Sequence, residues 1–280
     1  MVKITSIAEN TSLSELPAEH GLSLHIQIGN GPTILFDTGQ GGLFASNAES
    51  LGLNLADVDI AVLSHGHYDH GGGLGTFLSL NRKAKVFVHR NAFQAHYSLR
   101  ESGLTYIGID PSLKNESRIC PCTDRENIID GISLFAGVSG KFLKPLGNRL
   151  LFGPSRTDPD DFSHEQNLLI RDGANLILVA GCAHCGILNI MAKVVEITGE
   201  SPTHVFAGMH LVNSGLSEPQ EAEFIGSLAA SLKEYSSTMF YTMHCTGTEQ
   251  YRILKSLMGK QIDYLSCGES VVVQTRVTHP

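Results

Sequence analysis

The chain has 280 residues, of which 42% are hydrophobic, and its formal net charge is −8 at pH 7 with histidine neutral. A chain of this size can bury a large core in one α/β domain, and no apolar run approaches the roughly 18 residues that a membrane span needs. Because the chain is acidic and has no basic run, we expect no generic binding to nucleic acid. The N-terminal residues lack a long apolar segment with a cleavage site, so we expect a cytoplasmic protein with no membrane partner.

The first part of the chain predicts strands followed by helices. Apolar and polar residues alternate strictly from Leu22 to Ile28, and Thr33 to Phe36 pairs with this strand across a glycine-rich turn. This hairpin predicts that His25 faces solvent. The apolar run Asp59 to Ser64 then predicts a buried strand. A helix over about 72–80, a strand over 85–89 and a helix beginning near Asn91 are expected to follow.

Residues from about 101 to 165 are irregular and contain five prolines, which makes them a candidate cover for a site. A second series of elements follows. We predict strands over 167–170, 176–180, 204–207 and 238–243, and helices over 186–197, from Ser217, and from Thr246 or Thr248. The helix after Ser217 has a serine cap, an early proline and a glutamine three residues on, which are typical of a helix start.

The segment His65-Gly-His67-Tyr-Asp69-His70 places four potential metal ligands in six residues, directly after a predicted strand. In an extended or tightly turned segment, residues two apart project the same way, so His65 and His67 can share one ion while Asp69 and His70 turn towards another. The spacing therefore predicts two metal ions. Ordinary surfaces rarely concentrate three histidines and an aspartate in this way.

Three later histidines, His184, His210 and His244, each follow a predicted strand. Each alone could be a hydrogen-bonded loop residue, but together with the first cluster they are candidate ligands. Neutral imidazole suits zinc, and iron or manganese could occupy the same place. We therefore expect two divalent transition-metal ions as cofactors, foremost zinc.

The six cysteines are too dilute for a disulfide scaffold, and we expect reduced thiols. Cys182-Ala-His-Cys185 is a C-x-x-C pair without a second pair, and Cys120-Pro-Cys122 has the wrong spacing for a tight zinc pair. We expect Cys245 and Cys267 to be small core or near-site residues.

The motif of residues 65–70 resembles the signature of the metallo-β-lactamase superfamily, His-x-His-x-Asp-His after a core strand. More narrowly, five other segments resemble a subgroup of metal-dependent hydrolases labelled dihydropterin ribofuranosylaminobenzene-phosphate synthase-like. They are Ala18-Glu-His-Gly21, Leu35-Phe-Asp-Thr-Gly39, Gly181-Cys-Ala-His184, Gly208-Met-His-Leu211 and His244-Cys-Thr-Gly247. The resemblance implies an α/β fold of the αββα type, with two mixed sheets packed face to face and helices on both outer faces. It also implies one domain over 1–280, whose pseudo-equivalent halves meet near residue 165.

The resemblance further implies two ligand sets. His65, His67 and His184 would hold one ion, and Asp69, His70 and His244 the other. Most hydrolases of the superfamily carry a bridging aspartate at the end of the strand that here precedes His210, and this chain has no acid there. Imidazole has one free lone pair and cannot bridge two ions, so we expect His210 to cap one of them. Cys182 is the competing candidate because a thiolate can bridge, although we favour a role for it in a strand-to-helix turn.

These ligands predict a metal-dependent hydrolase in which metal-activated hydroxide attacks a phosphoester, foremost a phosphodiester. The loss of one carboxylate leaves the ion pair more positive, which favours a small anionic substrate. Asp69 and His70 are the candidate catalytic residues, since Asp69 could also orient the attacking water. His20 could face substrate or only support a turn, and Asp37 is expected to support a ligand or its turn.

Two other functions are compatible with these residues. The subgroup label implies a synthase or transferase in pterin-cofactor, methanopterin-like metabolism. A redox or non-catalytic metal protein on the same fold is a third possibility, but diiron redox relatives replace the second histidine by glutamate, and His67 counts against it. We expect His89 and His96 to be structural, while His164 and Glu165 could enter the cleft or be solvated.

Overall fold

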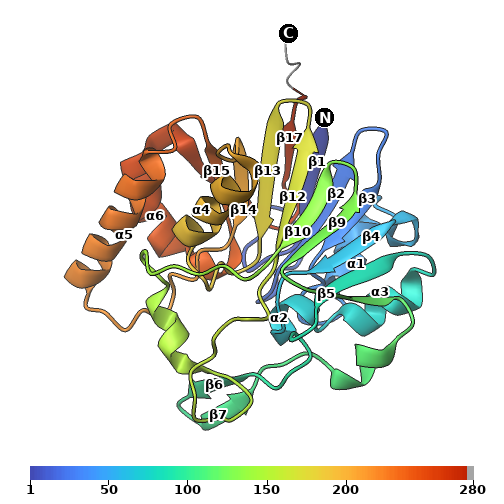
Figure 1. The fold of residues 1–280 in the computed structure, drawn as a ribbon, viewed down its shortest axis with the longest axis horizontal. Coiled ribbons are helices and arrows are strands. Elements are labelled where there is room, and N and C mark those ends of the chain that lie inside the picture. The colour runs from blue at the N-terminus through green and yellow to red at the C-terminus, as the bar shows by residue number, and fades with distance from the viewer. Residues whose placement is uncertain (276–280) are drawn as a thin grey trace.

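The computed structural model describes residues 1–275, in which two seven-stranded sheets pack against each other (Figure 1). The order of the first sheet is β17-β1-β2-β3-β4-β5-β8. Its pairs from β17 to β3 are antiparallel, and its pairs from β3 to β8 are parallel. Its strands are β1 (Val2–Ala8), β2 (Ser23–Ile28), β3 (Thr33–Phe36), β4 (Ile60–Leu63), β5 (Lys85–His89), β8 (Ile119–Cys122) and β17 (Ser270–Val273).

The second sheet has the order β16-β15-β14-β13-β12-β10-β9 and the same change of direction along it. Its pairs from β9 to β13 are antiparallel, and those from β13 to β16 are parallel. Its strands are β9 (Arg125–Ile129), β10 (Ile132–Phe135), β12 (Asn167–Asp172), β13 (Asn175–Ala180), β14 (His204–Ala207), β15 (Met239–Thr242) and β16 (Ile262–Tyr264). In each sheet the parallel strands therefore bring several carboxyl ends to one edge, where α/β proteins place their sites.

Helices cover the outer face of each sheet (Figure 1). They are α1 (Leu43–Ser50) and α3 (Leu74–Leu80) on the first sheet, and α4 (Ile187–Thr198), α5 (Glu218–Lys233) and α6 (Thr248–Met258) on the second. The short α2 (Tyr68–Gly71) follows β4 at the edge of the first sheet. Short 3-10 helices span Leu55–Asp57, Pro111–Asn115, Leu146–Leu150, His244–Thr246 and Gly259–Gln261. Among residues 1–275 no helix is long and apolar enough to cross a membrane.

The core lies in three apolar layers, which is the arrangement expected of an αββα sandwich. Val62 and Phe206 belong to the cluster between the two sheets. Phe77 of α3 packs with the outer face of the first sheet, and Met191 of α4 packs with that of the second. Because each sheet buries both faces, its strands carry nearly continuous apolar runs. The predicted fold class is confirmed.

The middle section forms a small third sheet, β11-β6-β7, which projects below the sandwich in Figure 1. Its strands are β6 (Tyr97–Arg100), β7 (Gly103–Tyr106) and β11 (Leu151–Phe152). The helix predicted to begin near Asn91 is wrong. The chain makes two successive turns, closed by hydrogen bonds from Ala92 N–H to His89 O and from Gln94 N–H to Asn91 O, and then enters β6. Buried contacts of His96 with residues far along the chain outweigh local helix preference here.

The prediction that His25 faces solvent is also wrong, because only 3% of this residue is exposed. Its cross-strand partners Thr5 and Leu35 are buried as well, and Leu35 belongs to the cluster that packs with α1 and α3. Strict alternation of apolar and polar residues shows that a strand has two different faces, but it does not show whether the polar face is exposed to solvent. Burial lowers the pKa of His25 to about 4.

Candidate metal centre

The candidate ligands meet at the carboxyl ends of four strands. Residues 65–70 follow β4, while His184, His210 and His244 follow β13, β14 and β15. The rings of His65, His67 and His184 lie 4.6 to 5.1 Å apart between centroids. The rings of His70 and His244 lie 4.9 Å apart, and His65 lies 4.1 Å from His70. The structure thus brings together both ligand sets that the resemblance implies.

The first set, His65, His67 and His184, presents unpaired nitrogens to one place. The Nε2 atom of each is buried and has no hydrogen-bond partner within the described part of the chain. The Nδ1–H of His65 donates to Ser64 Oγ at 2.8 Å, and that of His184 donates to Asn148 Oδ1 at 2.9 Å. Burial holds the pKa of both histidines well below its usual range, so they are neutral. Several buried, neutral imidazoles with free lone pairs fit a cation.

The second set consists of Asp69, His70 and His244. Asp69 Oδ2 lies 3.2 Å from His244 Nε2 and 3.8 Å from His70 Nε2, and the two nitrogens are 3.2 Å apart. Asp37 Oδ2 accepts from His70 Nδ1–H at 2.7 Å, and Asn10 Oδ1 accepts from His244 Nδ1–H at 2.7 Å. Both Nε2 atoms are therefore turned towards Asp69.

The charge around His70 also suits a cation. Burial opposes protonation of His70, but the carboxylates of Asp37 and Asp69 outweigh it and raise the pKa of His70 to about 9. A positive charge at this place is thus stabilised by two carboxylates. A metal ion bound at His70 Nε2 would displace the proton and take over that stabilisation.

Cys182 lies between the two sets of candidate ligands. The favoured role in a strand-to-helix turn does not account for this position. Its Sγ atom is 3.1 Å from His70 Nε2. It lies within 4.8 Å of ligand atoms of His65 and His184, and within the same distance of ligand atoms of His70 and His244. The thiol is therefore the atom shared by both sets, as a bridging ligand would be.

His210 lies beside the first set and also beside two cysteines. The structure groups it with Cys182 and Cys245, not with a histidine set, although its ring lies 4.4 Å from that of His184. Its backbone is left-handed, with φ of 45°, and its N–H donates to Cys245 Sγ at 3.3 Å. Cys245, expected as a small core or near-site residue, is thus itself a potential ligand.

Two buried glutamates hold the turns that carry His184 and His244. Glu9 Oε1 accepts the backbone N–H of His244 at 2.6 Å, and Glu165 Oε1 accepts that of His184 at 2.6 Å. The turns are strained, since φ is 52° at His244 and 51° at Ala183. Glu165, considered as a cleft residue, is instead this support. The only signal for Glu9 in the sequence is its position at the end of an apolar strand.

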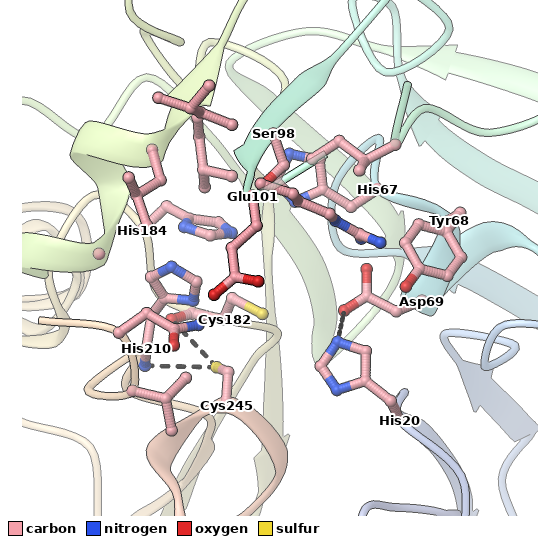
Figure 2. A pocket seen from close by; sticks show the side chains of 18 residues that line it. His20, His67, Tyr68, Asp69, Ser98, Glu101, Cys182, His184, His210 and Cys245 are labelled. Atoms are coloured by element: carbon pink, nitrogen blue, oxygen red, sulfur yellow. Dashed lines mark hydrogen bonds and ion pairs between the residues drawn. The ribbon is translucent and has the colours of Figure 1, made fainter. Parts of the chain in front are cut away.

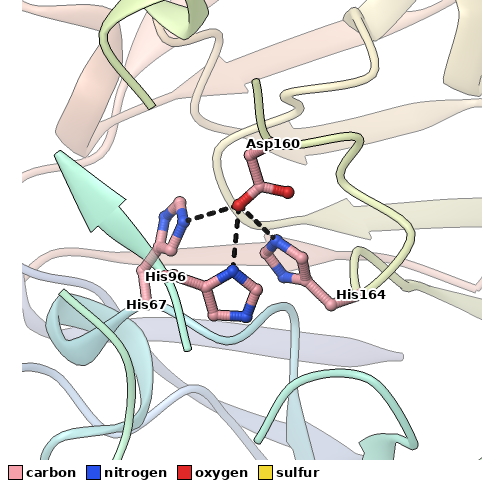
Figure 3. Close-up of side chains that lie close together, drawn as sticks. All are labelled: His67, His96, Asp160 and His164. Carbon is pink, nitrogen blue, oxygen red and sulfur yellow. Dashed lines mark hydrogen bonds and ion pairs between the residues drawn. The ribbon is translucent and has the colours of Figure 1, made fainter. Parts of the chain in front are cut away.

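Asp160 is a second support that the sequence did not indicate (Figure 3). Its Oδ2 accepts from His96 Nδ1–H at 2.9 Å and from His164 Nε2–H at 3.2 Å, and it lies 3.9 Å from His67 Nε2. Gly66 N–H donates to His164 Nδ1 at 2.9 Å, so the proton of neutral His164 is on Nε2. A protonated Nε2 cannot bind metal. This cluster therefore braces the loop of His67, which agrees with a structural role for His96.

A cavity of about 700 Å³ opens over the candidate metal centre (Figure 2). His67, Asp69 and His184 line it. The middle section lines it with Ser98 to Glu101 and with Leu150 and Leu151, so this section covers part of the site. His20 also lines the cavity, and its side chain is 54% exposed. Its Nε2–H lies 3.2 Å from Asp69 Oδ2, and this hydrogen bond raises the pKa of His20.

The fold is an αββα sandwich with candidate metal-ligand groups at the carboxyl ends of its strands, and comparison with known proteins gives the family. The model of the metallo-β-lactamase superfamily matches residues 17–184. The chain belongs to this superfamily, as the motif of residues 65–70 indicated.

Individual relatives cover nearly the whole chain. The chain is 27% identical to 7,8-dihydropterin-6-methyl-4-(β-D-ribofuranosyl)-aminobenzene-5′-phosphate synthase of Methanocaldococcus jannaschii, over 96% of each protein. It is 30% identical to an uncharacterized protein of the same organism, over 92% of this chain and 94% of that protein. A solved metal-dependent hydrolase of the β-lactamase superfamily is 28% identical, with a TM-score of 0.80, and the match covers 98% of this chain and 99% of that one.

Proposed function

We propose that this protein is a hydrolase with a binuclear metal centre that acts on a small anionic phosphoester, foremost a phosphodiester. The observation that carries the proposal is the set of three buried Nε2 atoms, on His65, His67 and His184, that make no hydrogen bond among the described residues. Leaving such atoms unpaired is costly, and a cation would pair all three. The neighbouring set of Asp69, His70 and His244 offers a place for a second ion.

Four of the histidine ligands would be held in their productive tautomer before metal arrives. Ser64, Asn148, Asp37 and Asn10 fix the Nδ1 side of His65, His184, His70 and His244. Such supports orient imidazole ligands and raise their basicity. When bound, the ions would lower the pKa of a water molecule and stabilise charge on the oxygens of the attacked ester.

Three residues of the cavity would act on substrate and water. Asp69 Oδ2 accepts from His20 Nε2–H at 3.2 Å and lies 3.2 Å from His244 Nε2, and it could orient the attacking water. His20 presents a partly exposed imidazole at the cavity wall, with a raised pKa, and it could donate a hydrogen bond to an anionic oxygen. Arg100 lines the same cavity and adds positive charge for an anionic substrate.

A phosphate-containing substrate is supported by the ligand chemistry and by a relative. No carboxylate from the end of β14 joins the two ligand sets, and a thiol lies between them instead. The ion pair would therefore keep more positive charge than one bridged by an additional carboxylate. The product named for the similar synthase also carries a 5′-phosphate.

The second candidate function is that of a synthase in pterin-cofactor metabolism. It is favoured by 27% identity to the synthase over 96% of both chains. The two candidates predict different products. Incubation with phosphoesters alone should release a phosphate-bearing fragment and an alcohol for the hydrolase, whereas the synthase should require a pterin precursor and form a larger product detectable by mass spectrometry.

The test of the leading proposal combines metal analysis with an activity panel. Protein purified without chelator should contain at least two transition-metal ions per chain by elemental analysis. It should hydrolyse a phosphodiester such as bis(4-nitrophenyl) phosphate faster than a phosphomonoester, a lactone or a β-lactam. No more than one ion after reconstitution with zinc, iron or manganese would overturn the binuclear centre. Robust β-lactam turnover without phosphoesterase activity would overturn the substrate class.

A further inference from the structure

Two thiols and one imidazole lie together on the side of the cavity formed by the second sheet. Cys182, His210 and Cys245 follow β13, β14 and β15, and one potential ligand atom from each lies within 4.8 Å of the others. Both cysteines are free and buried, and the Nδ1 atom of His210 is buried without a partner among the described residues. All three residues line the cavity (Figure 2).

The fold makes room for the second sulfur by leaving out a side chain. A Cβ atom on Gly208 would lie 2.6 Å from Cys245 Sγ and 2.9 Å from the carbonyl oxygen of Gly181. Gly208 is at the end of β14, close to where the resemblance places an aspartate in other hydrolases. The sulfur of Cys245 therefore fills space that any larger residue at position 208 would need.

The backbone holds this arrangement in place. His210 N–H donates to Cys245 Sγ at 3.3 Å, and Leu211 N–H donates to Cys245 O at 3.0 Å. His210 accepts a left-handed φ of 45° to make these contacts. Strain of this kind persists only where the surrounding structure enforces it, and it is concentrated at functional sites.

We propose that Cys182, His210 and Cys245 form a sulfur-rich metal site, joined to the two histidine-containing sets through Cys182. Its ligands suit a thiophilic ion, of which zinc is the most available, and they do not suit magnesium or calcium. On binding, each thiol loses one proton to solvent and forms one sulfur–metal bond, with no change of oxidation state. The inference shares Cys182 with the proposed metal centre but does not depend on the reaction catalysed.

The test uses ¹¹³Cd²⁺ as a probe for thiolate ligands in the full-length, reduced protein. The ¹¹³Cd NMR spectrum should contain a resonance in the range of ions bound by two thiolates. In Cys245→Ser that resonance should move to the single-thiolate range or disappear. Cobalt reconstitution gives a second readout, because the sulfur-to-cobalt absorption band of this ion should lose about half its intensity in Cys245→Ser.

Cys267→Ser is the matched control, because Cys267 is buried and free but belongs to no ligand group in the described chain. It should leave both spectra unchanged. A wild-type spectrum with single-thiolate resonances only would overturn the proposal, and this result needs no variant to fold. A two-thiolate resonance without phosphoesterase activity would support this site and count against the proposed reaction. Phosphoesterase activity without that resonance would support the proposed reaction and count against this site.

Discussion

The two regions that supply the candidate ligands are built in different ways. One loop after β4 carries His65, His67, Asp69 and His70 within six residues, whereas the second sheet contributes single residues from separate strand ends. The loop is fixed from the first sheet, through Asp37 and Ser64. The strand ends depend on support from distant segments.

Those distant supports cross between the sheets. Glu9 and Asn10, which follow β1 of the first sheet, bind the backbone and the ring of His244. His184 is held in a similar way by Glu165 and Asn148 of the middle section. The comparison teaches that a local motif brings its ligands together through the chain itself, although His164 and Asp160 also brace its loop, whereas a dispersed ligand is only as well placed as the remote residue that holds it. We therefore expect changes to the supports to matter most at the strand ends.

The largest expected effect comes from single variants that remove one ligand, either from the loop after β4 or from a strand end of the second sheet. His65→Ala and His184→Ala should each lose one ion and lower kcat/KM about 1,000-fold or more, because several kcal/mol of transition-state stabilisation depend on the ion. Elemental analysis and steady-state kinetics measure both effects. His204→Gln, which changes a half-buried histidine outside the ligand groups, is the control. Full metal content in either alanine variant would contradict the assigned first set.

Cys182→Ser tests whether the thiol joins the two regions. Because the sulfur lies near ligand atoms of both sets, we expect the variant to weaken both ions, by about 10- to 100-fold in affinity. Isothermal titration of the metal-free protein with zinc measures the two affinities. If Cys182 serves only the turn, the variant will retain both affinities, and the two sets will be independent.

A smaller effect is expected from the support of a dispersed ligand. Asn148→Leu removes the acceptor of His184 Nδ1–H and should lower metal affinity about 10- to 100-fold. Asn148→Asp keeps an acceptor oxygen and should restore most of the affinity. The same loss in both variants would mean that Asn148 acts through packing and not through the tautomer of His184.

The smallest effect concerns His25, a buried histidine that no carboxylate or ligand group supports in the described structure. Its folded pKa of about 4 is below the unfolded value of about 6.5, so the unfolded chain binds more protons as pH falls between these values. The contribution of neutral His25 to the free energy of unfolding is present above pH 6.5 and is lost as pH falls towards 4. We expect wild type to lose about 2 kcal/mol more than His25→Gln between pH 7 and pH 5.

Urea unfolding of the metal-loaded proteins at both pH values measures this difference. Comparison of the two proteins cancels the contributions of the other histidines. Equal losses would show that His25 gains a proton acceptor, or access to water, in the folded protein. The measurement therefore distinguishes a buried histidine without a hydrogen-bonding carboxylate or amide from the buried histidines that have one.

Local patterns were sufficient for much of the fold. Thr33–Phe36, Lys85–His89 and His204–Ala207 are strands with the bounds that the sequence predicts. The superfamily followed from one loop, because four ligands in six residues are a strong local signal. Ser217 and Gln220 form a capping box at the start of α5, where the sequence predicts a helix start, and a proline follows in the first turn. These features depend on side-chain periodicity and on interactions between near neighbours in the chain.

Tertiary structure decided which polar residues are buried and what they face. His25 is buried because helices cover the face that alternation had marked as polar. Cys182 lies between the ligand sets, and Cys245 lies beside it, because parallel strands bring the ends of β13 and β15 to one edge. Asp160 reaches three histidines from a proline-rich segment without periodic pattern. Sequence periodicity reports the direction of a side chain relative to its own element, whereas these contacts depend on which distant element packs opposite.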